Sequence, residues 1–258
     1  MKQVQIPRYG APDVLRVVEG PDPAPGPGQV RIAVRAAGVN FADVLARMGL
    51  YQDAPKPPMV VGYEVSGVLD AVGVAALQIA RAHGAEVLGT ASAGKHERLR
   101  QMGFAHLIDY RTTDFEAEVR RLTDGRGVHL VLDAVGGASF GKSYRSLAKN
   151  GRLFCFGISA LAPDQKRRWL AALKGFASMP WFHPGRLMLD NRGVFGVNLG
   201  QLWDEPAVMT DQLHQLLALY EGGTVAPIVD AAVPFAQAAD AHRRLQERQN
   251  LGKVVLVP

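Results

Sequence analysis

The apolar and polar positions follow two different patterns along the chain. Before residue 70, apolar residues alternate with polar ones over short stretches, most clearly from Val30 to Ala36, which is typical of a half-buried β-strand. A proline- and glycine-rich stretch, residues 21–28, predicts a loop, because proline removes a backbone donor and glycine favours turns. With a short helix expected over residues 41–47 and a strand over 59–69, this part is predicted to be rich in β-structure.

From residue 74 onward, helical and strand periodicity alternate. The predicted helices span residues 74–83, 95–102, 114–122, 139–148 and 205–221, and the predicted strands span 86–89, 107–109, 128–134, 151–156 and 193–199. Strands that alternate with helices predict a parallel sheet covered on both faces, so the fold class is α/β. The tail adds a strand at 225–230, a helix at 235–248 and a strand at 253–257.

One stretch, Tyr63 to Gly84, joins the two patterns. An apolar strand, Val65 to Leu69, passes through a short turn into the helix predicted from residue 74. Strand, glycine turn and helix are the start of a nucleotide-binding βαβ unit, in which the turn lies against the pyrophosphate of the cofactor. The turn here keeps a single glycine, Gly73, so the signal for a cofactor loop is weak.

Composition and charge exclude several classes of protein. With 258 residues, 48% of them hydrophobic and 21% charged, the chain has the composition of neither a disordered nor a fibrous protein. The net charge of +5 comes from scattered basic residues that acidic neighbours flank, so we expect no nucleic-acid partner. A mild basic excess also suits an anionic cofactor.

The single cysteine, Cys155, excludes an internal disulfide and a zinc site built from several thiolates. No apolar run is long enough to span a membrane, and residues 1–10 carry no apolar signal core, so we expect a cytoplasmic protein without stable membrane insertion. Residues 165–189 are rich in Trp, Phe and Leu, which favours a lid or wall beside a substrate cleft over contact with a membrane surface.

Several short segments carry a family resemblance. In chain order they are Gly38–Tyr51, Gly89–Lys95, Ile108–Arg111, Leu132–Gly137, Phe154–Gly157, Gly196–Leu199 and Gly252–Leu256. Together they resemble the zinc-free medium-chain dehydrogenase/reductases, specifically the quinone oxidoreductase group and its vesicle amine transport protein-like branch. The resemblance implies a Rossmann-type NADP-binding domain over residues 71–224 and a partial, GroES-like β-rich catalytic domain over residues 1–70 and 225–258.

The chain departs from that family where its two patterns meet. We infer an internal deletion at about residues 70–73, which leaves the first Rossmann strand missing or replaced. That strand is central in the sheet, so open strand edges are expected unless Val65–Leu69 takes its place. Asp70 and Ala71 stand where the family has turn glycines, which predicts weakened cofactor binding, while Gly73 keeps the position that serves helix–strand packing.

The residues after the strand at 86–89 indicate NADPH rather than NADH. NAD-binding chains carry an acidic residue about 20 positions after the first turn glycine, and that count reaches Thr90, beside Gly89. Ser92 and Lys95 can instead bind a phosphate, although Lys95 also fits an ordinary solvated helix lysine. The resemblance adds further cofactor-binding residues, most of which a simpler interpretation treats as strand-end turns: Tyr110, Gly137, Phe156, Gly157, Ile158, Ser159, Gly196, Val197 and Asn198.

Three polar residues are the catalytic candidates. Asn40 occupies the place of a ligand cysteine in zinc alcohol dehydrogenases, so the resemblance implies a zinc-independent enzyme without a metal site. Asn40, Asp43 and Tyr51 match polar residues that border nicotinamide and substrate in the quinone oxidoreductases. An amide can orient a carbonyl by hydrogen bonding and a phenol can donate or stack, whereas Asp43 fits a helix-capping role at least equally well.

The resemblance implies an NADPH-dependent oxidoreductase that transfers hydride to a quinone, an enone or a similar activated double bond. It also implies a homodimer that pairs through residues 193–199. The cofactor carries the hydride, so the protein is expected mainly to position it. An alternative stays open: a non-catalytic remnant or adaptor that keeps the fold and binds the cofactor weakly or not at all.

Overall fold

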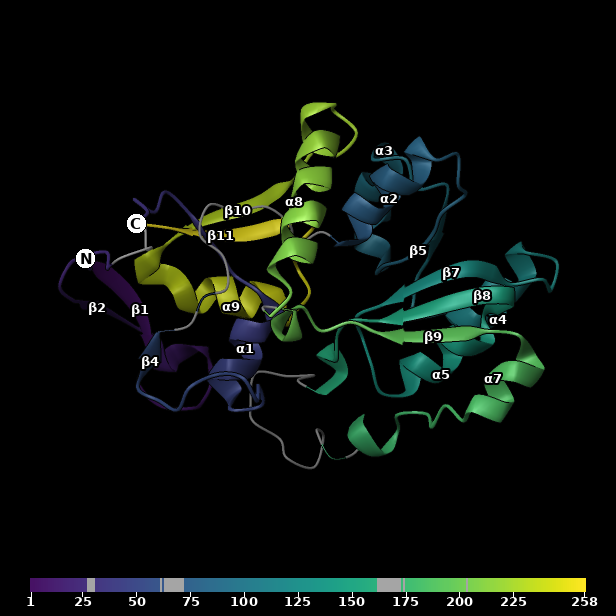
Figure 1. The fold of residues 1–258 in the computed structure, drawn as a ribbon, viewed down its shortest axis with the longest axis horizontal. Coiled ribbons are helices and arrows are strands. Elements are labelled where there is room, and N and C mark those ends of the chain that lie inside the picture. The colour runs from purple at the N-terminus through teal and green to yellow at the C-terminus, as the bar shows by residue number, and fades with distance from the viewer. Residues whose placement is uncertain (27–30, 61, 63–71, 162–172, 174, 203) are drawn as a thin grey trace. The chain divides into compact units, whose positions relative to one another are not determined.

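The chain divides into two compact units (Figure 1). The computed structural model describes all residues except 27–30, 61, 63–71, 162–172, 174 and 203. The first unit contains both chain ends, residues 1–75 and 226–258, and the second contains the described part of residues 76–225. The predicted junction, with Asp70, Ala71 and the strand Val65–Leu69, lies outside the described residues.

The first unit holds two small sheets that draw strands from both ends of the chain. One is antiparallel, with β1 (Lys2–Ile6) between β2 (Arg16–Glu19) and β4 (Met59–Val60). In the other, β11 (Lys253–Val257) lies parallel to β10 (Val229–Pro234) and antiparallel to β3 (Ala37–Gly38). The C-terminal strand is therefore the central strand of its sheet.

Two helices supply most of the core of this unit. Helix α1 (Phe41–Met48) ends at Gly49, which adopts the left-handed conformation that closes a helix, with φ of 71°. Helix α9 (Ala238–Gln246) contacts α1 and the short 3₁₀ turn η1 (Pro12–Val14). The side chains that they bury together with the sheets include Ile6, Val44, Met48, Leu245 and Val254.

The second unit consists of alternating helices and parallel strands, as the apolar pattern predicts. Its first part comprises most of α2 (Val72–Ala82), then β5 (Leu88–Thr90), α3 (His96–Gln101) and β6 (His106–Ile108), and β5 pairs with β6 in parallel. Its second part comprises α4 (Phe115–Leu122), β7 (Val128–Asp133), α5 (Ala138–Arg145), β8 (Leu147–Cys155), α7 (Pro184–Asp190), β9 (Gly193–Gly196) and α8 (Pro206–Glu221). The order of this parallel sheet is β7–β8–β9.

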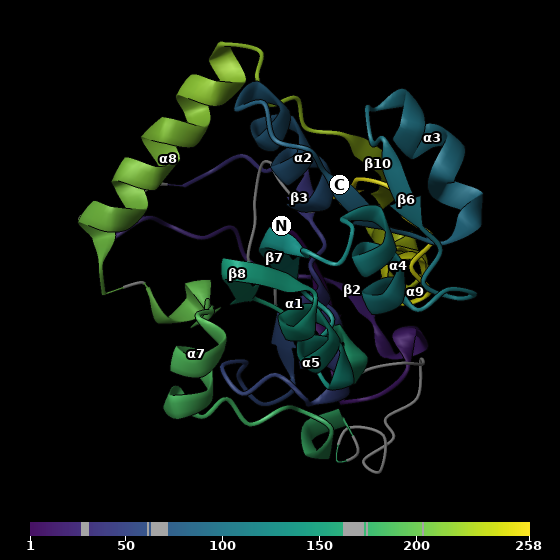
Figure 2. The same ribbon diagram turned by 90° about the vertical axis from the view of Figure 1, so that its right-hand side faces the viewer.

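The sheet β7–β8–β9 is covered on one face. Tyr144 of α5 packs with Leu147 and Leu153 of β8, and this cluster continues to Phe182 and Leu187 around α7. On the other face, Leu130, Leu132 and Phe195 are between 44% and 55% exposed. Helix α8 buries none of its residues and stands apart from the sheet in both views (Figures 1 and 2).

The sheet arrangement agrees with a first Rossmann strand that is missing or replaced. Among the described residues, β5–β6 and β7–β8–β9 are separate sheets rather than one continuous sheet. The position between β5 and β7 is the one that the first strand fills in a doubly wound sheet. No described strand pairs with both β5 and β7 to join the two sheets.

Two strand predictions need correction. The alternation at Val30–Ala36 predicts a strand, but the described residues 31–36 form none, and only Ala37–Gly38 pairs with β11. The strand predicted at 225–230 begins at Val229. At Val30–Ala36 the alternating pattern runs beyond the segment that has a hydrogen-bonded partner, and a strand needs that partner more than it needs propensity.

Candidate functional site

A buried carboxylate organises the turn that follows β7. Asp133, 4% exposed, ends the strand and accepts hydrogen bonds from the backbone N–H groups of Val135 at 2.7 Å and Gly136 at 3.2 Å. The hydroxyl groups of Ser139 and Ser143 on α5 donate to its other oxygen at 2.8 and 2.7 Å. Four donors satisfy the carboxylate, so Asp133 ties the turn to the start of α5.

The turns after β7 and β8 pack backbone against backbone. Gly136 and Gly137 have φ of 78° and 60°, a conformation that glycine adopts at low cost. A Cβ on Gly157 would lie 2.6 Å from the carbonyl oxygen of Ala134, so this position also requires glycine. The two turns are joined by hydrogen bonds from Phe156 N to Asp133 O, Ser159 N to Ala134 O and Ala160 N to Val135 O.

The predicted nicotinamide-binding residues therefore lie at neighbouring strand ends. Gly137, Phe156, Gly157, Ile158 and Ser159 belong to the two packed turns after β7 and β8. Gly196, Val197 and Asn198 follow at the end of β9, where Val197 N donates to Cys155 O at 2.9 Å. The Asn198 side chain accepts from Gly200 N at 3.0 Å and caps a short 3₁₀ turn, η4 (Leu199–Gln201). Open α/β sheets bind ligands at this edge.

Cys155 lies at the same edge but is not poised for chemistry. Burial, and then the charge of Asp133, raises the pKa of its thiol to about 11. The thiol is therefore protonated at neutral pH, and a thiol is a far weaker nucleophile than a thiolate.

The residues predicted to bind the cofactor phosphate lie at the carboxyl ends of the two-stranded sheet β5–β6. Parallel pairing sets Thr90 opposite Ile108, and Ala91 N donates to Ile108 O at 3.0 Å. Ser92 and Lys95 therefore follow β5 at the edge where Tyr110 follows β6, with Ser92 preceding the 3₁₀ turn η2 (Ala93–Lys95). The hydroxyl and ammonium groups, with no carboxylate between Thr90 and Lys95, suit a phosphate.

Two glycines of the predicted cofactor site have different surroundings. A Cβ on Gly89 would lie 2.8 Å from the ring of Phe104, so this glycine makes room for an aromatic side chain. Apart from its chain neighbours and the backbone of its own helix, no atom of the described residues lies within 4 Å of the Cβ position of Gly73. The helix–strand packing expected at Gly73 is thus not seen in the described part of the chain.

The catalytic candidates lie in the first unit, around the start of α1. The backbone N–H of Asn40 donates to Asp43 Oδ2 at 2.7 Å, so Asp43, 4% exposed, acts as a capping residue. The Asn40 Oδ1 accepts from Lys253 Nζ at 2.9 Å. Burial, then the charges of Asp53 and Asp43, raises the pKa of Tyr51, so its phenol stays neutral and can donate a hydrogen bond.

Lys253 is the residue that sequence reasoning missed. It lies 213 positions from Asn40, and its only signal was the family-like segment Gly252–Leu256. The side chain is 3% exposed, which is rare for lysine.

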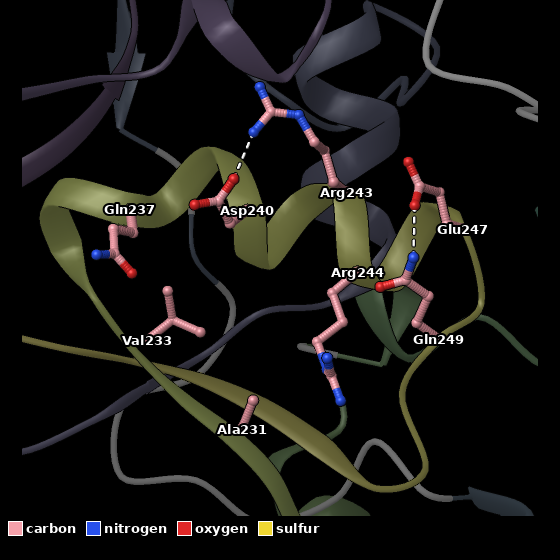
Figure 3. Close-up of a pocket in the computed structure, with 8 residues that line it drawn as sticks. All are labelled: Ala231, Val233, Gln237, Asp240, Arg243, Arg244, Glu247 and Gln249. Atoms are coloured by element: carbon pink, nitrogen blue, oxygen red, sulfur yellow. Dashed lines mark hydrogen bonds and ion pairs between the residues drawn. The ribbon is translucent and has the colours of Figure 1, made fainter.

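A groove of about 320 Å³ lies between β10 and α9 (Figure 3). Its charged side chains engage one another or their neighbours: Arg243 binds Asp240, Arg244 binds Asp230, and Gln249 donates to Glu247. None of the predicted site residues lines it. This groove is therefore not the candidate site.

The described residues form neither a metal-binding cluster nor a helix that could span a membrane. They contain no group of three or more His, Cys, Asp or Glu side chains that could hold a metal ion. Of the helices built from them, none combines the length and apolar character that crossing a membrane requires.

A unit of parallel strands that end in glycine turns, together with a β-rich unit built from both chain ends, is typical of a dehydrogenase-type α/β protein. Family models agree: residues 26–114 match the alcohol dehydrogenase GroES-like domain and residues 102–256 match the zinc-binding dehydrogenase domain. The chain belongs to the medium-chain dehydrogenase/reductase family and is of the zinc-free, quinone oxidoreductase type.

Similar proteins extend over nearly the whole chain. The synaptic vesicle membrane protein VAT-1 homolog of Rattus norvegicus is 31% identical, over 97% of this chain and 82% of its own. The Homo sapiens homolog is 30% identical, over 97% and 84%. The alignment with the rat protein spans 333 positions, more than the 258 residues of this chain, so the relative has internal residues without a counterpart here.

Solved structures share the fold. A mycobacterial structure described as complexed with NADPH has a TM-score of 0.81 at 23% identity and covers 100% of both chains. Escherichia coli quinone oxidoreductase, also complexed with NADPH, has a TM-score of 0.80 at 20% identity, again over 100% of both chains.

Proposed function

We propose that the protein is an NADPH-dependent oxidoreductase that reduces a quinone, an enone or a similar activated double bond. The observation that carries the proposal is the pair of packed glycine turns at the ends of β7 and β8. The similar structures complexed with NADPH support the same cofactor here. NADPH supplies the hydride, and the chain binds and orients the two reactants.

We assign binding of the phosphate end of the cofactor to the second unit. Ser92 and Lys95 offer a donor and a positive charge after β5, and Tyr110 follows the neighbouring strand. A carboxylate at position 90 would bind the ribose hydroxyl groups of NADH and so favour that cofactor, but this position holds a threonine. We therefore assign the NADPH preference to Ser92 and Lys95.

In the first unit, Asn40 and Tyr51 are assigned to the substrate. A carboxamide N–H and a neutral phenol both donate hydrogen bonds, and the oxygen of a quinone or enone gains negative charge as hydride arrives. Asp43 is assigned a structural role, because its carboxylate caps the residue that would touch the carbonyl. We place the protein in the cytoplasm and propose pairing of two copies through β9.

A second candidate is a non-catalytic remnant or adaptor. The separation of β5–β6 from β7–β8–β9 among the described strands favours it, because the cofactor turn normally follows the strand between them. Weak or absent cofactor binding would then be expected.

Cofactor titration of the Lys95→Ala variant tests the preferred function. Loss of one ion pair to the phosphate should weaken NADPH binding roughly tenfold or more and leave NADH binding unchanged. Isothermal titration calorimetry and NADPH oxidation with a soluble quinone provide the measurements. Lys149→Ala, an exposed lysine of the same unit, is the matched control.

Two outcomes would contradict the proposal. If Lys95→Ala weakened the binding of NADPH and of NADH equally, Lys95 would not be the residue that contacts the cofactor phosphate. Absence of any heat of binding at millimolar NADPH in the unmodified chain would favour the remnant.

A further inference from the structure

His96 holds the turn that carries Ser92, a predicted phosphate-binding residue. Its ring nitrogen Nε2 lies 2.9 Å from the carbonyl oxygen of Ala91, five residues earlier in the chain. A carbonyl oxygen only accepts hydrogen bonds, so Nε2 carries the proton and donates. His96 is half-buried at the start of α3, and Ala91 is buried directly after β5. The contact therefore closes the whole connection between the strand and the helix.

Two hydrogen bonds fix the orientation of the backbone at Ala91. Its N–H donates to Ile108 O of β6 at 3.0 Å, and its C=O accepts from His96. The peptide between Ala91 and Ser92 is trans, so its C=O and N–H groups point in opposite directions. While His96 holds the C=O, the N–H of Ser92 is directed away from the imidazole ring.

Ser92 has two donors that the described part of the chain does not use. It precedes the 3₁₀ turn η2, where a serine side chain commonly caps the backbone, yet its hydroxyl makes no capping bond. Within the described residues, neither its N–H nor its hydroxyl meets an acceptor. Its own carbonyl accepts from Lys95 N at 2.9 Å, which closes the turn. Two half-buried donors without a protein partner suit a ligand with several acceptor oxygens.

We propose that His96 is a positioning residue that directs the N–H of Ser92, and with it the serine hydroxyl, toward the 2′-phosphate of NADPH. This inference rests on the function proposed above, which assigns the phosphate to Ser92 and Lys95. NADH lacks that phosphate, so His96 contributes to cofactor selectivity rather than to hydride transfer. Hydrogen bonds to a charged acceptor are stronger than neutral ones, and a donor that is held in place makes them at a lower entropic cost.

Calorimetric titration of His96→Leu with NADPH and NADH tests the proposal. Leucine fills similar space without a donor, so the dissociation constant for NADPH should rise roughly tenfold while that for NADH stays unchanged. His96→Gln places an amide N–H near the position of Nε2 and should restore most of the NADPH affinity. His129→Leu, at an exposed histidine of the same unit, should bind both cofactors as the wild type does.

A double-mutant cycle with Ser92→Pro tests whether His96 acts through Ser92. Proline removes both donors, and the φ of Ser92, −67°, is already the φ of proline. In the Ser92→Pro background, His96→Leu should therefore cause no further loss of NADPH affinity. An equal loss in both backgrounds would overturn the proposal. Equal weakening of NADPH and NADH in His96→Leu would also overturn it, because it would show that the histidine only stabilises the fold.

Adenosine 2′,5′-bisphosphate separates the role of His96 from the proposed function. It carries the 2′-phosphate but no nicotinamide, so it should bind at the turn whether or not the chain transfers hydride. Equal binding to the wild type and to His96→Leu would overturn the role of His96 and leave the oxidoreductase proposal standing. Binding that depends on His96, in a chain that reduces no quinone, would overturn the proposed activity alone. A wild type that binds neither NADPH nor the bisphosphate at millimolar concentration would overturn both.

Discussion

At the scale of the residue, buried polar groups are the most informative feature of the chain. Asp133 meets four donors, and Arg47, fully buried, donates to Gly10 O and to Gln246 Oε1. His242, 4% exposed, lies on α9 in the same core as Arg47. Burial, and then the positive charge of Arg47, lowers its pKa to about 3.

His242 should make the first unit sensitive to acid. Its folded-state pKa is below the ordinary value of 6.5, so the neutral form is the one that folding favours. The contribution of His242 to stability is fully present above pH 6.5 and declines as the pH falls toward 3. The free energy of unfolding should fall by up to about 1.4 kcal/mol per pH unit over this range. Urea unfolding at several pH values should show this slope, and His242→Gln should reduce it.

The same change at an exposed histidine provides the control. His129→Gln, on β7, should leave the pH dependence of unfolding as it is in the wild type. An unchanged slope in His242→Gln would mean that carboxylates alone cause the acid sensitivity.

At the scale of the element, the sheet β7–β8–β9 has two unlike faces. Leu153 is 0% exposed against Tyr144 and Leu147, whereas Leu130 and Leu132 are 55% and 44% exposed. Parallel sheets are normally covered on both faces. As far as the described residues show, the second face is therefore unusually exposed for a parallel sheet.

Two leucine truncations measure this asymmetry. Leu153→Ala should lower the free energy of unfolding by about 2–5 kcal/mol, because it leaves a cavity. Leu130→Ala should cost less than about 0.5 kcal/mol, as exposed substitutions do. Chemical unfolding followed by circular dichroism gives both values, and equal costs would show that the second face is covered in solution.

At the scale of the whole molecule, the two chain ends depend on each other. β11 is the central strand between β10 and β3, and its Val254, Val255 and Leu256 are buried. We therefore expect the first unit to fold only when residues 253–257 are present.

Removal of residues 253–258 should abolish cooperative unfolding of the first unit. The loss exposes buried valines and unpairs two strands, so the near-ultraviolet circular dichroism and the amide dispersion of this unit should collapse. Removal of Pro258 alone, which is exposed, should leave both unchanged. A truncated chain that keeps a native spectrum would show that β11 is dispensable.

Prediction from the sequence succeeded where a local pattern is sufficient. Helices at 41–47, 114–122 and 205–221 were located to within about two residues at each end. The family resemblance names Gly137 and Gly157 as cofactor-binding candidates, which stays a prediction, and nothing in the sequence indicates the close approach of Gly157 to Ala134. The strand predicted at 30–36 failed because alternation says nothing of whether a partner strand is within reach.

The sequence by itself determined the α/β alternation, the family and the absence of a multi-thiolate zinc site, because periodicity, motif order and cysteine count are all readable along one dimension. Only the tertiary structure decided that Asp43 caps a helix and that Lys253 meets Asn40. Only it divided the described parallel strands into two sheets. Each of these depends on which segments become neighbours, and the register of β11 against β3 brings together residues 213 positions apart.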